Sequence, residues 1–259
     1  MTTWTIVTGA SEGLGIEFAR LAAKENRNLI LVARSEDKLS ALANELRSGT
    51  VQVEVMPADL SNLDQTEAFW AKASDGRQID RLVNNAGLGS HGDFGDGQTW
   101  MRELSSMNVN MTALAYLMKQ GIAHMQTHGG GRILNVASVA GFTPGPNMAI
   151  YHATKAFVLS LSEAVAEELR GKDVSVTALC PGATATAFFD AADMHKVRLL
   201  KLGQPMSAQL VAEQGWIAMR GGKRIVVPGV MNKVFAFLPR ITPRRVTTFV
   251  ASKIMGKGR

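Results

Sequence analysis

The sequence predicts a single α/β domain in which helices cover both faces of a doubly wound parallel sheet. Short apolar or β-branched segments alternate with longer helical patterns along the 259 residues, and this alternation implies right-handed crossovers between parallel strands. Residues 29–32 are apolar at every position, as a strand covered on both faces requires. No internal repeat and no linker rich in Pro, Gly or Ser divides the chain, so we expect one domain over residues 1–259.

The pattern predicts seven strands and, before the last of them, six helices. We expect the strands at residues 5–8, 29–33, 51–56, 81–84, 132–137, 174–179 and 224–227. We expect the helices at residues 13–26, 36–47, 63–73, 100–125, 151–170 and 207–219. Residues 220–259 then hold the last strand and a basic helical extension.

The composition is that of a globular protein, with 46% hydrophobic and 19% charged residues. The single cysteine, Cys180, excludes an intrachain disulfide and is compatible with a reducing compartment. We see no signal peptide before the first strand, and no apolar run approaches the roughly 20 residues that span a bilayer. We therefore expect a cytoplasmic protein.

Charge is unevenly distributed. The net charge is +6, and no acidic residue follows Glu213, whereas ten of the 28 basic residues do. Such an asymmetry can mark a surface for membrane lipid, nucleic acid or an anionic substrate. Because the basic residues are dispersed and form no block, we favour solvated side chains around C-terminal helices.

The first expected strand leads into a glycine-rich turn, Thr8–Gly15, which opens the first helix. This arrangement presents backbone N–H groups and a helix N-terminus to a phosphate. Gly9 allows a sharp turn, Gly13 a close approach to a pyrophosphate, and Gly15 tight packing of helix on strand. The spacing G-x-x-x-G-x-G differs from the common G-x-G-x-x-G fingerprint, and no Gly-Lys-Ser/Thr of a Walker loop follows. A turn without a ligand is therefore the alternative.

Open α/β sheets bind ligands at the carboxyl ends of their strands. The second strand ends at Arg34, a position where dinucleotide sites for an unphosphorylated ribose carry Asp or Glu. A guanidinium there suits the 2′-phosphate of NADP(H). The alternative is an ordinary surface arginine at the end of a strand. Asp59, beside Leu60, suits an adenine amino group, and an N-cap by Ser61 or Asp59 is the competing explanation. Residues 84–87 (NNAG) follow the fourth strand, where asparagine side chains can tie strand ends together.

A catalytic group is expected at the fifth strand. Ser138 ends this strand, and thirteen residues later Tyr151 and Lys155 share one face of a helix. An ammonium beside a phenol lowers the phenol pKa, so Tyr151 could exchange a proton with an alkoxide or an alcohol while Ser138 holds the same oxygen. Each residue alone also has an ordinary structural explanation, namely packing, solvation or capping.

Taken together, these motifs resemble the short-chain dehydrogenase/reductase family. The matching residues are Thr8-Gly-x-x-x-Gly-x-Gly15, Asn84-Asn-Ala-Gly87, Ser138, Tyr151-x-x-x-Lys155 and Pro181-Gly182, over roughly residues 5–190. The resemblance implies a Rossmann fold and hydride transfer at the nicotinamide C4. It also implies that Asn110 completes a catalytic tetrad by holding a water next to Lys155. Asn108 is the competitor for this role, and the small-residue helical run after Asn110 decides between them.

The resemblance further implies the contacts with the cofactor. Lys155 bonds the nicotinamide ribose, and residues 181–186 lie against the carboxamide, with Thr186 as the side-chain contact. The expected cofactor-binding residues are Gly9, Ser11, Glu12, Gly13, Leu14, Gly15, Arg34, Asp59, Leu60, Asn85, Ala86, Gly87, Tyr151, Lys155, Pro181, Gly182, Thr184 and Thr186. Family members that prefer NADP often carry Lys or Arg where this chain has Glu12, which weakens the prediction from Arg34 without reversing it. We expect NADP(H), with NAD(H) as the alternative.

The substrate wall is expected from residues 141–148 and 187–206, and a lid from residues 182–219. Phe142, Met148, Phe188, Phe189, Met194 and Leu199 make these segments apolar. We therefore expect a small hydrophobic carbonyl or alcohol substrate, no nucleic-acid partner, and a homodimer or homotetramer. The alternatives are an NADP(H)-binding regulator without turnover, or a protein that contacts a membrane surface through its basic C-terminus.

No metal site is expected. Only His124 and His128 have a spacing of four residues, and they stand near a helix end where cationic or capping side chains are common. His152 lies about 100° around the helix from Tyr151, and Cys180 precedes a proline at a strand end. We expect both to be packing residues.

Overall fold

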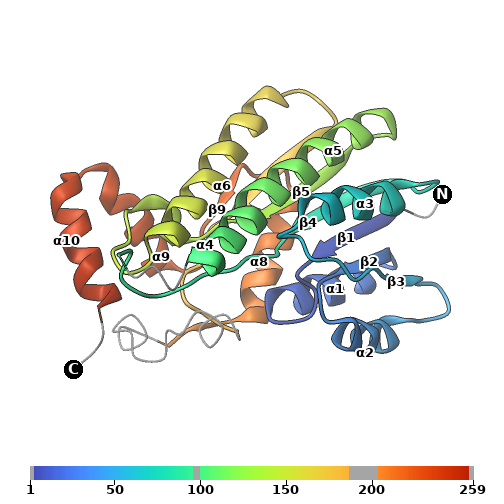
Figure 1. The fold of residues 1–259 in the computed structure, drawn as a ribbon. Coiled ribbons are helices and arrows are strands. Elements are labelled where there is room, and N and C mark those ends of the chain that lie inside the picture. Colours follow the sequence, from blue (N-terminus) through green and yellow to red (C-terminus); the bar gives the residue numbers. More distant parts are fainter. Residues whose placement is uncertain (1–2, 96–99, 187–203, 257–259) are drawn as a thin grey trace.

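The computed structural model describes residues 3–95, 100–186 and 204–256. Its main sheet has seven parallel strands in the order β3-β2-β1-β4-β5-β6-β9, and the order reverses between β1 and β4 (Figure 1). The strands are β1 (Trp4–Thr8), β2 (Asn28–Val32), β3 (Val53–Val55), β4 (Ile79–Asn84), β5 (Gly131–Val136), β6 (Val174–Leu179) and β9 (Ile225–Val226). The predicted doubly wound Rossmann sheet is confirmed; β3 and β9 are shorter than expected.

Two layers of helices cover the sheet. One layer contains α1 (Leu14–Lys24), α2 (Glu36–Leu46) and α8 (Ala208–Arg220), and the other α3 (Leu63–Ser74), α5 (Leu114–Thr127) and α6 (Ala149–Glu168). Successive side chains of β2 pack alternately against the two layers. Leu29 and Leu31 pack in the same cluster as Phe18 of α1, and Ile30 packs in the same cluster as Trp70 of α3. The strand is apolar throughout because both of its faces are buried.

The helix predicted at residues 100–125 is divided into three parts. They are α4 (Trp100–Met107), a π-helical turn η2 (Asn108–Ala113) and α5. The wider π-helical turn interrupts the regular backbone hydrogen bonding of the α-helix. Asn110 lies within it and is fully buried.

The segment expected to form a lid contains a core helix. Val211, Trp216 and Met219 of α8 are buried against the sheet, so a lid formed by this segment ends before Ala208. Two short strands, β7 (Thr184–Ala185) and β8 (Met206–Ser207), pair with each other just before α8. Residues 187–203 lie outside the described residues, and with them Phe188, Phe189, Met194 and Leu199.

After β9 the chain forms α9 (Val230–Phe237), a short 3-10 turn η5 (Leu238–Arg240) and α10 (Arg244–Met255). These elements lie at one end of the molecule, beyond the carboxyl ends of the strands (Figure 1). The ring Nε2 of His91 hydrogen-bonds the carbonyl of Met255 at 2.9 Å and ties α10 to the loop after β4. No helix in the described ranges is both long enough and apolar enough to cross a membrane.

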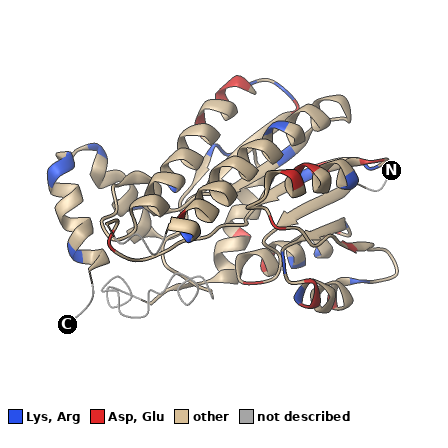
Figure 2. Cartoon of the chain, viewed as in Figure 1, with Lys and Arg blue, Asp and Glu red and all other residues tan. Residues whose placement is uncertain are grey.

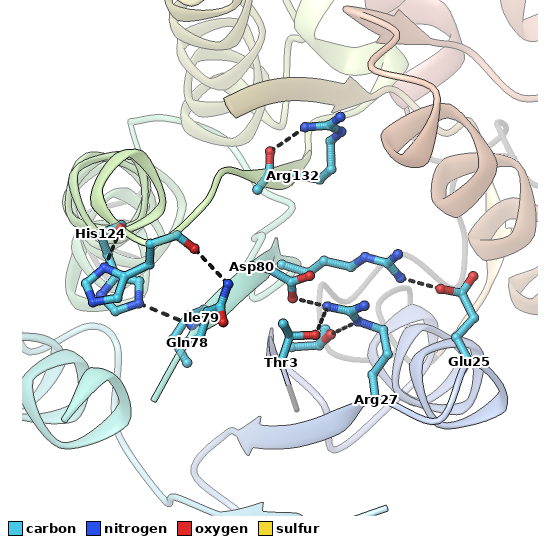
Figure 3. Close-up of polar contacts among 12 residues, drawn as sticks. Thr3, Glu25, Arg27, Gln78, Ile79, Asp80, His124 and Arg132 are labelled. Carbon is cyan, nitrogen blue, oxygen red and sulfur yellow. Dashed lines mark hydrogen bonds and ion pairs between the residues drawn. The ribbon is translucent and has the colours of Figure 1, made fainter. Parts of the chain in front are cut away.

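The opposite edge of the sheet, where the strands begin, is closed by polar contacts (Figure 3). The guanidinium of Arg27 donates to the Thr3 hydroxyl at 2.8 Å and to the Thr5 hydroxyl at 3.0 Å, and it pairs with Asp80. Burial, helped by the charge of Arg81, lowers the pKa of Arg27 to about 10. Arg27 is still charged at neutral pH, and its polar partners offset the cost of burying that charge.

A second group of contacts joins the helices to this edge. Arg81 of β4 pairs with Glu25, which follows α1, and Glu25 also accepts a hydrogen bond from Trp216 Nε1 of α8 at 2.8 Å. The Arg81 guanidinium lies 4.9 Å from the Trp216 ring centroid. Strand, loop and helix are thus connected at the end of the sheet remote from the site described next.

Candidate active site

A cavity of about 970 Å³ lies at the carboxyl ends of the strands, where open α/β sheets bind their ligands. Most of the predicted site residues line it, namely Gly9, Ser11, Glu12, Gly13, Leu14, Arg34, Asp59, Leu60, Asn85, Ala86, Gly87, Ser138, Tyr151, Lys155, Pro181, Gly182, Thr184 and Thr186. Gly15 and Asn110 lie behind this wall, because neither lines the cavity. Residues spread over almost 180 positions are thereby collected at one edge of the sheet.

The glycine turn adopts backbone angles that only glycine accommodates without strain. Gly9 has φ +66° and Gly13 has φ +54°, and a Cβ on Gly13 would lie 2.8 Å from Thr186 Cγ2. A Cβ on Gly15 would lie 2.1 Å from the Gly9 carbonyl oxygen. Gly15 therefore packs helix on strand, as predicted, whereas Gly9 and Gly13 allow Ala86 and Thr186 to approach the turn closely.

Asn85 joins the glycine turn to the end of β4. Its side-chain amide donates to the carbonyls of Thr8 and Gly9 at 2.9 and 3.1 Å, and the Thr8 hydroxyl accepts from the backbone N–H groups of Asn85 and Ala86, each at 3.0 Å. Asn84 donates instead to the Asn135 side chain at 2.9 Å. The asparagines tie neighbouring strand ends, as the sequence indicated.

Arg34 lines the cavity just after β2. Glu12, whose charge argued against a nearby 2′-phosphate, forms an ion pair with Lys38 of α2, and both side chains are about half exposed. Lys38 thus offsets the negative charge of Glu12 on the same side of the cavity as Arg34. Sequence reasoning missed Lys38 because it stands 26 positions from Glu12.

Asp59 and Leu60 line the cavity after β3. The Asp59 carboxylate accepts from the Ser61 N–H at 2.9 Å and from the Ser61 hydroxyl at 2.8 Å. The N-cap of α3 is Asn62, whose side chain accepts from the Gln65 N–H at 3.2 Å. The suggestion that Ser61 or Asp59 caps this helix is therefore wrong.

Ser138 and Tyr151 are hydrogen-bonded to each other within the cavity wall. Burial raises the pKa of the Tyr151 phenol to about 12, and the hydrogen bond with Ser138 opposes this rise. The Ser138 hydroxyl also accepts from the Ala140 N–H at 3.1 Å and donates to the Pro181 carbonyl at 3.4 Å. These contacts fix Ser138 between β5 and the start of the segment after β6.

Lys155 lies beside Tyr151 and is also buried. Its ammonium is 5.7 Å from the Tyr151 ring centroid and donates to the Val136 carbonyl at 2.8 Å. Burial lowers the pKa of Lys155 to about 8. We expected Lys155 to lower the pKa of Tyr151, but in this structure burial dominates and the phenol holds its proton.

Asn110 lies behind Lys155 and Gly87. A Cβ on Gly87 would be 3.4 Å from both Asn110 Oδ1 and Lys155 Nζ. The Asn110 side chain accepts from the Leu88 N–H and donates to the Leu88 carbonyl and to the Thr154 hydroxyl, each at 2.9 Å. Its competitor Asn108 donates to the Ser61 carbonyl at 3.0 Å. This placement supports Asn110 as the residue next to Lys155.

The segment after β6 contacts the C-terminal helices, which sequence reasoning did not foresee. A Cβ on Gly182 would lie 2.2 Å from Asn232 Oδ1 of α9, so a larger residue there would displace the Asn232 side chain. Asn232 Nδ2 donates to the Pro228 carbonyl at 2.7 Å. Thr184 is buried and donates to the Gly182 carbonyl at 3.1 Å. Asn232 therefore helps to shape the backbone of the Pro-Gly segment.

The substrate side of the cavity differs from the prediction. Thr143 and Met148 come from the expected segment 141–148, and Gln204 and Met206 from the described end of 187–206. Phe142 packs in a core cluster instead. Much of the remaining wall comes from the C-terminal helices, with Val230, Met231, Phe235, Leu238, Val246, Val250 and Ile254. No local signal in the sequence could have found them, because the fold alone brings this extension to the site.

His152 and Cys180, which were expected to be packing residues, are both buried, and His152 also lines the cavity. His152 is buried, its Nδ1 bonds the Thr143 carbonyl at 2.8 Å, and burial lowers its pKa. His124 and His128 stack on each other with ring centroids 4.0 Å apart. Cys180 is buried, and burial raises its pKa to about 12. No cluster of three or more metal-binding side chains occurs within the described ranges.

The residues present fit a phosphate-bearing nicotinamide dinucleotide. Gly9 and Gly13 line the cavity with positive φ angles just before α1, Arg34 offers a guanidinium for a 2′-phosphate, and the volume is sufficient. The phenol of Tyr151 and the apolar side chains of α9 and α10 line the same cavity. The cavity can thus hold a dinucleotide and an apolar carbonyl compound together.

Comparisons with known proteins agree with this geometry. A family model described as short chain dehydrogenase matches residues 3–196. The ketoacyl reductase HetN of Nostoc is 35% identical over 70% of this chain and 65% of its own length. The very-long-chain 3-oxoacyl-CoA reductase-A of Danio rerio is 28% identical over 96% of this chain and 74% of its own length. A short-chain dehydrogenase of Sphingobium yanoikuyae, solved with NADPH, superposes with a TM-score of 0.81 at 30% identity, over 93% of this chain and 97% of that one.

Proposed function

Since this chain belongs to the short-chain dehydrogenase/reductase family and is an NAD(P)-dependent oxidoreductase acting on CH–OH groups, we propose that it reduces lipophilic ketones with NADPH. The observation that carries the proposal is the placement of Ser138, Tyr151 and Lys155 in one cavity with the glycine turn. The reverse reaction, oxidation of the corresponding alcohol, uses the same groups.

The proposed chemistry assigns one role to each side chain. A nicotinamide bound in the cavity would supply a hydride from its C4 to the carbonyl carbon. Tyr151, which holds its proton in this structure, donates that proton to the carbonyl oxygen as the C–O double bond becomes single. Ser138 hydrogen-bonds the same oxygen, and Lys155 stabilises the phenolate left behind, with Asn110 next to it.

The preference for NADPH rests on charge. Arg34 stands where a carboxylate would select an unphosphorylated ribose, and Lys38 neutralises Glu12. A 2′-phosphate would then meet the Arg34 guanidinium, while the charge of Glu12 is offset by its ion pair. This balance favours NADPH, and NADH remains the weaker alternative.

The substrate class rests on the apolar wall. Side chains of α9 and α10, among them Val230, Phe235, Leu238 and Val250, line the part of the cavity remote from the glycine turn. Two relatives are named for ketoacyl and very-long-chain 3-oxoacyl substrates. We propose a ketone with an apolar chain or ring system, turned over by a cytoplasmic homodimer or homotetramer.

A screen with both cofactors tests the proposal. Ketones of increasing apolar size are offered to the purified protein, and nicotinamide absorbance is followed with NADPH and with NADH. We expect turnover that rises with apolar size and is faster with NADPH. Tight NADPH binding without turnover of any ketone would favour the alternative of a regulatory protein, and equal turnover of small polar ketones would contradict the substrate class.

A further inference from the structure

The C-terminal extension exposes an unusual share of the apolar side chains. Of the seventeen large hydrophobic side chains that are exposed among the described residues, ten lie between residues 230 and 250. Ile241 is 69% exposed, Phe249 62% and Phe237 56%. Single exposed apolar side chains are common on protein surfaces and need no explanation. Many of them in one short segment indicate an interaction surface.

The charge around these side chains has one sign. Arg240, Arg245 and Lys253 are exposed and are paired with no carboxylate of the described chain. The sequence contains no acidic residue after Glu213. Figure 2 shows Lys and Arg on α10 and no Asp or Glu. The partner of this surface must therefore tolerate both apolar side chains and a high density of positive charge.

The two faces of α10 differ in what they contact. Val246, Val250 and Ile254 line the cavity from one face. Arg245, Phe249 and Lys253 follow one another at intervals of four residues on another face, and the Lys253 ammonium lies 5.2 Å from the Phe249 ring centroid. Helices that lie at the boundary between lipid headgroups and acyl chains combine Lys and Arg with exposed aromatic and apolar side chains, as α10 does.

The cavity reaches the same surface. Val230 lines the cavity and is 75% exposed, and Met231 lines it and is 63% exposed. Phe235 and Val246 also line the cavity while remaining exposed. The helices that carry the cationic and apolar side chains are therefore the same helices that surround an opening of the cavity.

We propose that the C-terminal surface, defined by Phe237, Arg240, Ile241, Arg245, Phe249 and Lys253, binds an anionic phospholipid bilayer, so that the cavity opens onto the bilayer. Lipid phosphates attract the cations, and the acyl boundary accepts the apolar side chains. Nucleic acid satisfies only the cations, because its exterior offers phosphates and no apolar layer. A twofold dimer formed through this surface would bring the same uncompensated charges together.

The binding has a consequence for the reaction, which rests on the proposed reductase function. A ketone dissolved in the bilayer can pass into the cavity between α9 and α10 without first crossing water. The enzyme then meets its substrate at the concentration that the ketone reaches in lipid, which exceeds the concentration in water for an apolar compound. The protein lies on the membrane in this arrangement and does not span it.

Co-sedimentation of the full-length protein with vesicles tests the docking. Vesicles of phosphatidylcholine alone are compared with vesicles that also contain phosphatidylglycerol, without ketone or NADPH. We expect binding to the anionic vesicles only, weakened when salt is raised to about 1 M, where screening extends over only about 3 Å. The triple variant R240Q/R245Q/K253Q should lower the partition coefficient about 100-fold.

A second triple variant separates apolar contact from charge. F237S/I241S/F249S changes three exposed side chains that do not line the cavity, and it should also weaken vesicle binding while leaving its salt dependence in place. Matched controls are K72Q/K119Q/K172Q for charge and L63S/L210S/I217S for apolar exposure, all at exposed positions on other elements. Both controls should bind like the unchanged protein.

Three results would overturn the docking proposal. The first is equal binding to both kinds of vesicle, and the second is a loss of vesicle binding in the control variants as large as that in the surface variants. The third is that the unchanged protein binds neither kind of vesicle, whereas a surface variant has a different molecular mass in light scattering. The last result would assign the surface to a second copy. Reduction of a water-soluble ketone without vesicles is measured on every variant, so that a failure of the reductase function is seen separately. Delivery fails if vesicles do not accelerate reduction of a bilayer-dissolved ketone by the unchanged protein.

Discussion

The ammonium of Lys155 lies 5.7 Å from the ring centroid of Tyr151, and both side chains are buried. Burial moves their pKa values apart, to about 12 for the phenol and about 8 for the ammonium, because it disfavours the charged form of each group. At neutral pH the phenol holds a proton and the ammonium remains mostly charged. This is the state that a reductase needs before proton donation.

The pH dependence of ketone reduction should follow Lys155. Its cation is the active form, and its pKa of about 8 predicts kcat/KM that is constant below this pH and falls about tenfold per pH unit above it. Tyr151 stays protonated throughout this range. Initial rates of reduction with NADPH at saturating cofactor measure the profile.

Lys155→Arg provides the control for this assignment, because a guanidinium keeps its charge across the measured range. The variant should be slower but should show no decline near pH 8. A decline at the same pH in the variant would assign the titration to another group.

Replacing Tyr151 by Phe removes the proton donor while keeping the ring. We expect kcat for reduction to fall by about 100- to 10,000-fold, whereas NADPH binding, followed by nucleotide fluorescence, stays close to that of the unchanged protein. The chain has only two tyrosines, and the other, Tyr116, does not line the cavity. Tyr116→Phe should therefore retain activity, and an equal loss in both variants would contradict the assigned role.

Arg34→Asp tests the cofactor preference. The change removes a charge-assisted partner of the 2′-phosphate and introduces a carboxylate suited to a free ribose hydroxyl. We expect the ratio of kcat/KM with NADPH to kcat/KM with NADH to fall by about 10- to 100-fold. An unchanged ratio would show that Arg34 does not contact the phosphate.

Lys38→Gln tests the role of the Glu12 ion pair. Loss of the ammonium leaves the Glu12 carboxylate unpaired at the cavity, and we expect NADPH to bind about two- to fivefold more weakly while NADH binding is unaffected. In the double variant Glu12→Gln/Lys38→Gln the unpaired charge is gone, so NADPH affinity should recover. A double variant as weak as the single one would mean that Lys38 contacts the cofactor directly.

The sequence was sufficient for the parts of the site that depend on local order. Thr8–Gly15, Asn85 and Ser138 each follow a strand, and parallel strands deliver their carboxyl ends to one edge, so the order of motifs predicted their meeting. Tyr151 and Lys155 share a helix face, and their spacing predicted their proximity.

The remaining features depend on contacts between distant segments. No repeating pattern in the sequence predicts which distant segments will meet. Three such contacts shape the site, namely the ion pair of Lys38 with Glu12, the contact of Asn232 with Gly182, and the cavity wall formed by α9 and α10. The π-helical turn around Asn110 was also missed, because a single extra residue in a helix does not disturb an apolar pattern enough to be read. Burial, which raises the pKa of Tyr151, likewise follows from the assembled fold.

The ion pair between Arg27 and Asp80 should contribute strongly to stability, in contrast to a surface pair on the same sheet. The Arg27 side chain is 12% exposed and that of Asp80 is 23% exposed, so Asp80→Ala leaves a mostly buried guanidinium without its counter-ion. We expect the free energy of unfolding in urea to fall by about 3 kcal/mol. Glu54→Ala is the matched control, because Glu54 also stands on a strand and pairs with an arginine, Arg77, but is more exposed; we expect a loss of about 1 kcal/mol or less. Equal losses would mean that burial of Arg27 does not make its pairing with Asp80 important.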